Sequence, residues 1–317
     1  MMDPKQLSRL DTLIYSVYYA PRGRYRLYLV ASEIARRYLT PTDYLIGIIG
    51  DEGSGKSTLI RGLFPGLELT NEDEGVNIRR APIYSFSPDD YFSGHTFHID
   101  VRHELAFTQK YKIREAIRRA VEHKRRVVVE HFDLIYEVLG YNAHVLIGIG
   151  EEIIVARPTV FGPFPQNIKA IVDKTIRYRL MAHSAEDLTT YILERDYNYR
   201  PSSPLIHSDI RHGFVINFNE RPKIGLDELE GKVKEIIAAD LPIVSVPGED
   251  MIMVGDIKIC CTGPRTHVDR TGQIENFRLL KEFRLNPLTN NFMLIGMVGE
   301  KTIAGFEDII EYMDIED

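Results

Sequence analysis

The chain lacks several features that mark membrane-bound, disulfide-stabilised or nucleic-acid-binding proteins. It has no apolar run approaching the roughly 18 to 20 residues that cross a bilayer. Its only two cysteines are adjacent, so they cannot build an ordinary disulfide framework. The formal net charge is −7, whereas generic nucleic-acid binding depends on a basic face. We therefore expect a globular protein without a membrane partner, in which RNA binding would need a local basic patch.

The N-terminal segment mixes charged residues into every apolar run. It lacks the order of a basic, an apolar and a small-residue region that defines a signal peptide. This pattern predicts a cytoplasmic protein. A reducing interior would keep both thiols available for a metal ion or for packing.

The length of 317 residues predicts two domains, and no internal repeat or low-complexity tract is present. Apolar residues at helical spacing predict a helical N-terminal extension over residues 1–40, interrupted at 21–23 and closed by Pro41. Three prolines and a glycine within 158–165 predict a boundary there. The expected domains are therefore residues 41–160 and 161–317.

A nucleotide-binding motif occupies residues 50–57. The run GDEGSGKS matches GxxxxGK(S/T) in full and follows LIGII, an apolar run typical of a buried strand. Backbone N–H groups of such a loop point at phosphate oxygens, while Lys56 would contact the β- and γ-phosphates and Ser57 would bind Mg²⁺. The alternative is a glycine-rich turn into a helix. The predicted ligands of ATP (or GTP) are Gly50, Gly53, Ser54, Gly55, Lys56, Ser57 and Thr58.

Acidic residues follow two further predicted strands. Asp89 and Asp90 come after a short alternating apolar run, and Glu130 ends the run RRVVVE. Acids at the carboxyl ends of parallel strands can hold Mg²⁺ or accept a proton from an acceptor hydroxyl. These three are the candidate catalytic residues. The alternative is that Asp89 and Asp90 cap a turn.

Residues 45–157 resemble the uridine kinase group of P-loop kinases. The resemblance rests on GDEGSGKST, on DDYF and on VVVEHFDLI. It implies phosphoryl transfer with an aspartate of DDYF on the acceptor side, although the arginine-bearing lid of that group is not recognisable in HVLIGIGEEIIVARPTVFGP. A basic run nearby is interpreted as a solvated helix end, with nucleic-acid contact as the alternative; it comprises Arg118, Arg119, Lys124, Arg125 and Arg126.

Candidate metal ligands lie in the second half of the chain. His183 and Asp187 are four residues apart, hence neighbours on a helix, and they continue an apolar stripe. Cys261 and His267 follow a predicted strand. Imidazole, carboxylate and thiolate all suit zinc. The alternatives are a helix capping box from Ser184 to Asp187 and a Cys261 that is simply packed in the core.

Residues 175–285 resemble the editing domain of alanyl- and threonyl-tRNA synthetases, also called the second additional domain. That family carries HxxxH and a CxxxH within CGGTHV. His183 matches the first histidine, Asp187 stands at the second, and Cys261 and His267 match the rest after a two-residue insertion at 264–265. The resemblance implies a zinc site made of these four residues, and a tRNA or aminoacyl-RNA end as partner.

The expected fold is therefore an α/β P-loop domain, a parallel sheet with flanking helices, joined to an α+β editing-like domain. Three functions remain open at this point. The first is an ATP hydrolase or phosphotransferase that governs a metal-binding domain recognising an aminoacyl-RNA end or a related small ligand. The second is a metal-dependent hydrolase of misacylated tRNA with nucleotide as regulator. The third is a non-catalytic nucleotide sensor.

Overall fold

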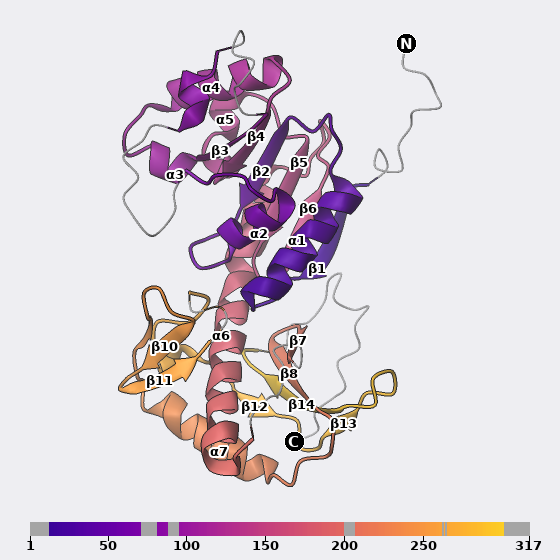
Figure 1. Ribbon diagram of the computed structural model, residues 1–317, viewed down its shortest axis with the longest axis vertical. Coiled ribbons are helices and arrows are strands. Elements are labelled where there is room, and N and C mark those ends of the chain that lie inside the picture. The colour runs from indigo at the N-terminus through magenta and orange to yellow at the C-terminus, as the bar shows by residue number, and fades with distance from the viewer. Residues whose placement is uncertain are drawn as a thin grey trace. The chain divides into compact units, whose positions relative to one another are not determined.

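The chain folds into two compact units, each combining helices and sheets (Figure 1). The computed structural model describes residues 13–70, 81–87, 95–199, 207–261, 263 and 265–300. Unit 1 is Met1–Ile176 and unit 2 is Arg177–Asp317. The expectation of a mixed α/β protein is confirmed. Within the described ranges no helix is long and apolar enough to cross a membrane.

Unit 1 is built on one six-stranded sheet with the order β1-β6-β5-β2-β4-β3. The strands β5, β2, β4 and β3 run parallel to their neighbours, and β6 runs antiparallel to both β5 and β1. The sheet is therefore mixed, with its parallel part in the position expected for residues 41–160. The strands are β1 (Tyr15–Tyr19), β2 (Leu45–Ile49), β3 (Thr96–Asp100), β4 (Arg126–Glu130), β5 (Val145–Ile149) and β6 (Glu152–Ala156).

Helices cover both faces of this sheet (Figure 1). On one face α1 and α2 pack with Ile46 and Ile48, and on the other α4, α5 and the first turns of α6 join the core that contains Leu45. A strand covered on both faces is apolar along its whole length, which explains why LIGII is completely buried. The helices are α1 (Arg24–Tyr38), α2 (Lys56–Leu63), α3 (Val101–Glu104), α4 (Lys110–Glu122), α5 (Tyr136–Leu139) and α6 (Pro165–Tyr197), with short 3-10 turns at Pro82–Ser85 and Phe132–Leu134.

The prediction of a helical extension over residues 1–40 is wrong for its first described part. Tyr15–Tyr19 is strand β1, paired antiparallel with β6 at the edge of the sheet. Tyrosine and valine favour strands, and the edge position offers pairing that a helix here would forgo. Only Arg24–Tyr38 is helical, as expected, and it packs on the sheet as part of unit 1.

The expected boundary at residue 160 is displaced. The division falls after Ile176, inside the 33-residue helix α6. The proline-rich segment before it marks the start of that helix, because Pro165 stands at its first position, where the missing N–H is not needed. Ile168 and Val172 of α6 belong to the core of unit 1, whereas residues from Tyr178 onward belong to the core of unit 2.

Unit 2 has the antiparallel α+β character expected of the second domain. One sheet has the order β11-β10-β9, and the other has the order β12-β14-β8-β7 with β13 also pairing to β14. The later turns of α6 and the helix α7 (Leu226–Ala238) supply apolar residues to a single core with both sheets. The strands are β7 (His207–Ile210), β8 (Gly213–Phe218), β9 (Ile243–Ser245), β10 (Met251–Val254), β11 (Ile257–Cys260), β12 (Arg278–Leu279), β13 (Arg284–Leu285) and β14 (Phe292–Met297), and a 3-10 turn spans Thr271–Gln273.

Candidate functional site

The loop between β2 and α2 holds the predicted nucleotide ligands in unit 1. Gly53 and Gly55 have φ angles of 71° and 93°, in the left-handed region that side chains disfavour. The second of them is directly followed by α2, so the N-terminal N–H groups of that helix face the loop. Ser57 and Thr58 lie in its first turn and are partly buried. The segment thus has the local form that a phosphate requires: a glycine turn leading into a helix.

Lys56 is the first residue of α2, and only 8% of it is exposed. Its Nζ donates a hydrogen bond to the backbone oxygen of Asp51 at 2.8 Å, and Ser54 Oγ donates to the same oxygen at 2.7 Å. Burial lowers the pKa of Lys56, against the opposing charges of Glu130 and Asp100. The ammonium group therefore lies folded onto the loop, in a place where an anionic ligand would relieve its desolvation.

Two carboxylates end neighbouring strands in unit 1. Asp100 closes β3 and Glu130 closes β4, and the two residues are paired in register. With His131 they form a buried group whose potential ligand atoms all lie within 4.8 Å of one another. Because β2 is parallel to β4, their C-terminal ends lie side by side, and the glycine loop leaves the sheet beside these acids. Their negative charges act on Lys56 and oppose the lowering of its pKa by burial.

A buried histidine positions Glu130. His98 on β3 accepts the backbone N–H of Thr70 at its Nδ1, 3.0 Å away, so its proton is on Nε2. That Nε2 then donates to Glu130 Oε1 at 3.0 Å. The residue after Glu130, His131, has a lowered pKa because it is buried and close to the charge of Lys56. Both imidazoles therefore lie beside the acidic pair, and the Nε2–H of His98 binds one of its carboxylate oxygens.

Arg102 lies on α3 beside the glycine loop. It forms ion pairs with Glu52 at 3.0 Å and Asp51 at 3.6 Å, and its side chain is 45% exposed. Its charge contributes to lowering the pKa of Lys56, after burial. The predicted catalytic residues Asp89 and Asp90, with the rest of DDYF, lie outside the described residues.

The four predicted metal ligands of unit 2 meet in one place. Their potential ligand atoms lie within 4.8 Å of one another. Cys261 Sγ is 3.5 Å from His183 Nε2 and 3.7 Å from His267 Nε2. Asp187 Oδ2 is 2.9 Å from His267 Nε2 and 3.9 Å from His183 Nε2. Helix α6 supplies two of the donors and the segment after β11 supplies the other two.

The surrounding contacts aim these donors at a common centre. His183 Nδ1 donates to the backbone oxygen of Thr266 at 2.8 Å, which leaves the lone pair of Nε2 facing the group. Burial would raise the pKa of Asp187, but the two histidines outweigh it and the pKa is lowered. Burial and the nearby Asp187 raise the pKa of the Cys261 thiol well above its usual range. A cation at the centre would reverse that effect and hold the thiolate.

The two cysteines have opposite environments. Cys261 is buried in the core of unit 2, and Cys260 is exposed. The Sγ of Cys261 also accepts the backbone N–H of Gly263 at 3.2 Å. Ser184, which the sequence also allowed as a helix cap, has other partners. Its hydroxyl donates to the backbone oxygen of Leu180 within α6 and accepts the N–H of Val268 at 3.1 Å. The Ser184 hydroxyl therefore connects α6 to the segment that carries His267, and it does not cap a helix.

A small pocket of about 270 Å³ adjoins this group of donors. His267 forms part of its wall together with Arg177, Asp269 and Glu275. The pocket therefore offers one cation and two carboxylates beside an imidazole that belongs to the donor set.

Sequence reasoning missed Asp100, His131 and His98. Asp100 ends the run HTFHID, in which alternation of polar and apolar residues indicates a strand, so its position after a strand was a usable signal. The roles of the two histidines depend on contacts with Thr70 and Lys56, which no local pattern contains.

Neither a scan against protein-family models nor a search of curated proteins gives a match for this chain. The interpretation of both sites therefore rests on their geometry.

Proposed function

We propose that unit 1 binds a nucleoside triphosphate with Mg²⁺ and cleaves or transfers its terminal phosphoryl group. The observation that carries this proposal is the convergence of the glycine loop, Lys56 and the pair Asp100–Glu130 at one edge of a parallel sheet. Ligands of such sheets bind outside the carboxyl ends of the strands. Oxygen donors beside a phosphate-binding loop suit Mg²⁺, which keeps few protein ligands and uses phosphate oxygens for the rest.

Each residue has a stated task in this proposal. The loop N–H groups and Lys56 bind the phosphates, and the Ser57 hydroxyl with Glu130 or Asp100 holds the metal ion. When bound, Mg²⁺ neutralises phosphate charge as it develops. His98 orients Glu130 through the bond at Nε2. Asp89 or Asp90 remains the candidate base for an acceptor hydroxyl.

The test is calorimetric titration of the full chain with ATP or GTP and Mg²⁺. Lys56→Ala is expected to weaken binding at least about tenfold, or roughly 1.4 kcal/mol, because it removes the cation nearest the phosphates. Lys110→Ala, on the exposed start of α4, is the control for loss of one positive charge. Equal affinity of the wild type and Lys56→Ala would reject the proposal.

A second candidate function belongs to unit 2, which we propose binds a zinc ion through His183, Asp187, Cys261 and His267. The donor set supports zinc, because two imidazoles, a thiolate and a carboxylate suit it and four protein ligands fill a tetrahedron. A filled tetrahedron favours a structural ion. Hydrolysis of an aminoacyl ester, the alternative, would require Asp187 to yield its position to water, and the pocket lined by Arg177 and Glu275 is the observation that favours this alternative.

The two roles of unit 2 can be separated by measurement. Purified protein should carry up to one zinc per chain by elemental analysis. Asp187→Asn should then lower zinc affinity without activating hydrolysis if the ion is structural. If wild-type protein releases amino acid from an aminoacyl-tRNA in a zinc-dependent reaction, the editing hydrolase becomes the better assignment.

A further inference from the structure

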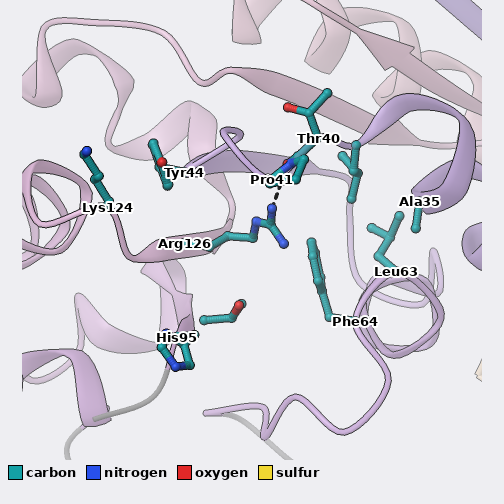
Figure 2. Close-up of a pocket in the computed structure, with 11 residues that line it drawn as sticks. Ala35, Thr40, Pro41, Tyr44, Leu63, Phe64, His95, Lys124 and Arg126 are labelled. Atoms are coloured by element: carbon teal, nitrogen blue, oxygen red, sulfur yellow. Dashed lines mark hydrogen bonds between the residues drawn. The ribbon is translucent and has the colours of Figure 1, made fainter. Parts of the chain in front are cut away.

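Unit 1 has a pocket of its own, shown in Figure 2. It lies at the N-terminal ends of the parallel strands, whereas the glycine loop follows the C-terminal end of β2. Its volume is about 550 Å³. Tyr44, Thr96 and Arg126 line it, and they stand at or just before the first residues of β2, β3 and β4. The glycine loop follows the other end of β2. Because a five-residue strand is roughly 15 Å long, a molecule in this pocket would not be the nucleotide bound at the loop.

The lining of this pocket is basic. His95, Lys124 and Arg126 contribute to its wall, and no acidic residue among those that the structure describes does. Neither Lys124 nor Arg126 forms an ion pair with any carboxylate that the structure describes. The acid closest in sequence to the wall, Asp43, is bound instead by Arg157, at 2.7 and 2.9 Å. A chain with a net charge of −7 therefore gathers positive charge at one concave place, with no ion-paired carboxylate among the described residues of that wall.

Arg126 is held in position before any ligand arrives. Its Nε donates to the backbone oxygen of Asp43 at 2.9 Å. Its Nη2 donates to the backbone oxygen of Thr40 at 2.7 Å, a bond drawn in Figure 2. The guanidinium carbon also lies 5.4 Å from the centre of the Phe64 ring. Both hydrogen-bond acceptors are neutral carbonyls, so the charge of the guanidinium is retained while its orientation is fixed. A fixed guanidinium with N–H donors to spare suits a phosphate group.

Lys124 occupies a strained backbone position at the rim. Its φ angle is 57°, in the left-handed region, just after α4 ends. Glycine or asparagine ordinarily takes this position after a helix. A lysine is thus present where backbone geometry alone would select a smaller residue.

The neighbouring Arg125 donates to His95 Nδ1 at 2.6 Å, which leaves the imidazole proton on Nε2.

We propose that this pocket binds the phosphate group of a small phosphorylated molecule, as a site separate from the glycine loop. The volume lies within the range of roughly 300 to 1,000 Å³ typical of small-molecule sites. The positioned Arg126 would form paired hydrogen bonds to phosphate oxygens, Lys124 would add a mobile positive charge, and His95 would donate from Nε2. The basic run interpreted from the sequence as a solvated helix end is then in part a binding wall.

The experiment measures the binding of inorganic pyrophosphate to the full chain by calorimetry. Lys56→Ala serves as the parent protein, because it weakens any contribution from the glycine loop. Pyrophosphate binding should persist in this parent. Adding Lys124→Gln should weaken it about tenfold, whereas the matched control Lys112→Gln, which removes an exposed lysine from the body of α4, should change it less than twofold.

A second variant guards against misfolding. Lys124→Gly suits the left-handed backbone, so it should fold at least as well as the parent while binding pyrophosphate as weakly as Lys124→Gln. Absence of pyrophosphate binding to the parent would overturn the proposal. Equal losses of pyrophosphate affinity in Lys124→Gln and Lys112→Gln would overturn the proposal and indicate a diffuse basic surface. The same conclusion would follow if a 5′-phosphorylated RNA bound better than pyrophosphate and both variants weakened its binding equally.

Discussion

The potential metal-binding groups of the two units differ in their donor atoms and in how far apart their residues lie in the chain. In unit 1, Asp100 and Glu130 end adjacent, already paired strands, and with His131 they offer mainly hard oxygen ligands. In unit 2, the donors His183 and Asp187 lie about eighty residues before Cys261 and His267, and they include a soft thiol. The first group suits Mg²⁺ and the second suits zinc.

The difference in sequence separation has an energetic meaning. An ion held by Asp100 and Glu130 connects strands that their backbone hydrogen bonds already hold together, so it adds little to the fold. An ion held by His183 and Cys261 ties α6 to the segment after β11, and its binding energy becomes folding energy. The proposed zinc ion should therefore contribute to the stability of unit 2, whereas the proposed Mg²⁺ in unit 1 should matter only for chemistry.

The largest expected effect is the loss of zinc from unit 2. Cys261→Ser should abolish zinc binding and lower the free energy of unfolding of unit 2 by about 4 kcal/mol when free zinc exceeds the dissociation constant a thousandfold. Thermal unfolding with and without a chelator, together with elemental analysis, measures this. Cys260→Ser is the matched control and should change neither quantity, because Cys260 is exposed. If the two serine variants have the same zinc content and the same free energy of unfolding, neither thiol is a metal ligand.

A slightly smaller loss of stability is expected when the ion pair between Asp43 and Arg157 in unit 1 is broken. Asp43 is almost fully buried, and Arg157 and the N–H of Thr40 outweigh burial and lower its pKa. Asp43→Asn should cost about 3 kcal/mol at pH 7, because it removes the buried carboxylate that pairs with the partly buried Arg157. Since the folded-state pKa is lowered, this stability is present above the unfolded pKa of about 3.9 and is lost as the pH falls through the folded value.

The measurement for Asp43 is urea denaturation of the wild type and variant between pH 7 and pH 3. The gap between them should stay constant down to about pH 4 and then narrow. Chelation of zinc should leave this gap unchanged. A gap that instead widens on acidification would contradict the assignment of a lowered pKa to Asp43.

Glu130→Gln tests whether the acidic pair of unit 1 serves chemistry. If the proposed phosphoryl cleavage or transfer occurs, turnover should fall about a hundredfold, or roughly 2.7 kcal/mol in the barrier, while the stability of the unit changes far less. Glu137→Gln on the exposed side of α5 controls for the loss of one carboxylate. Unchanged turnover in Glu130→Gln would show that the hydrogen bond between His98 and Glu130 is structural and has no part in the reaction.

The smallest effect is expected at Arg102. Its ion pairs with Asp51 and Glu52 are exposed, so Arg102→Ala should change the free energy of unfolding by less than about 0.5 kcal/mol. Because the guanidinium lies beside the glycine loop, the proposed nucleotide affinity should fall about threefold at low salt and recover towards the wild-type value near 1 M salt. A stability loss well above that limit would show that the loop depends on these ion pairs even without nucleotide.

The sequence was sufficient wherever the chemistry is local. The strand LIGII, the glycine loop and the helix after it are consecutive, so their order alone predicts their arrangement. The spacing of His183 and Asp187 likewise puts two donors on one face of a helix. The convergence of Cys261 and His267 on that face was available only through a resemblance to a known family.

The remaining features depend on contacts between distant segments. Tyr15–Tyr19 becomes a strand because β6 offers it an edge, and β6 follows more than 130 residues later. The pairing of Asp100 with Glu130 requires knowing that β3 and β4 are neighbours. The pocket at Arg126 is invisible in the sequence, since its wall comes from α1, α2 and the starts of several strands.

Helix α6 limits how this protein can be divided or recombined. Gly148 on β5 has no room for a Cβ atom, which would come within 2.4 Å of Ile168 on α6, so the sheet surface is shaped to this helix. The same helix later carries His183 and Asp187. A truncation before residue 165 would remove Ile168 and Val172 from the core of unit 1. A breakpoint inside α6 would interrupt the one helix that supplies apolar residues to the cores of both units.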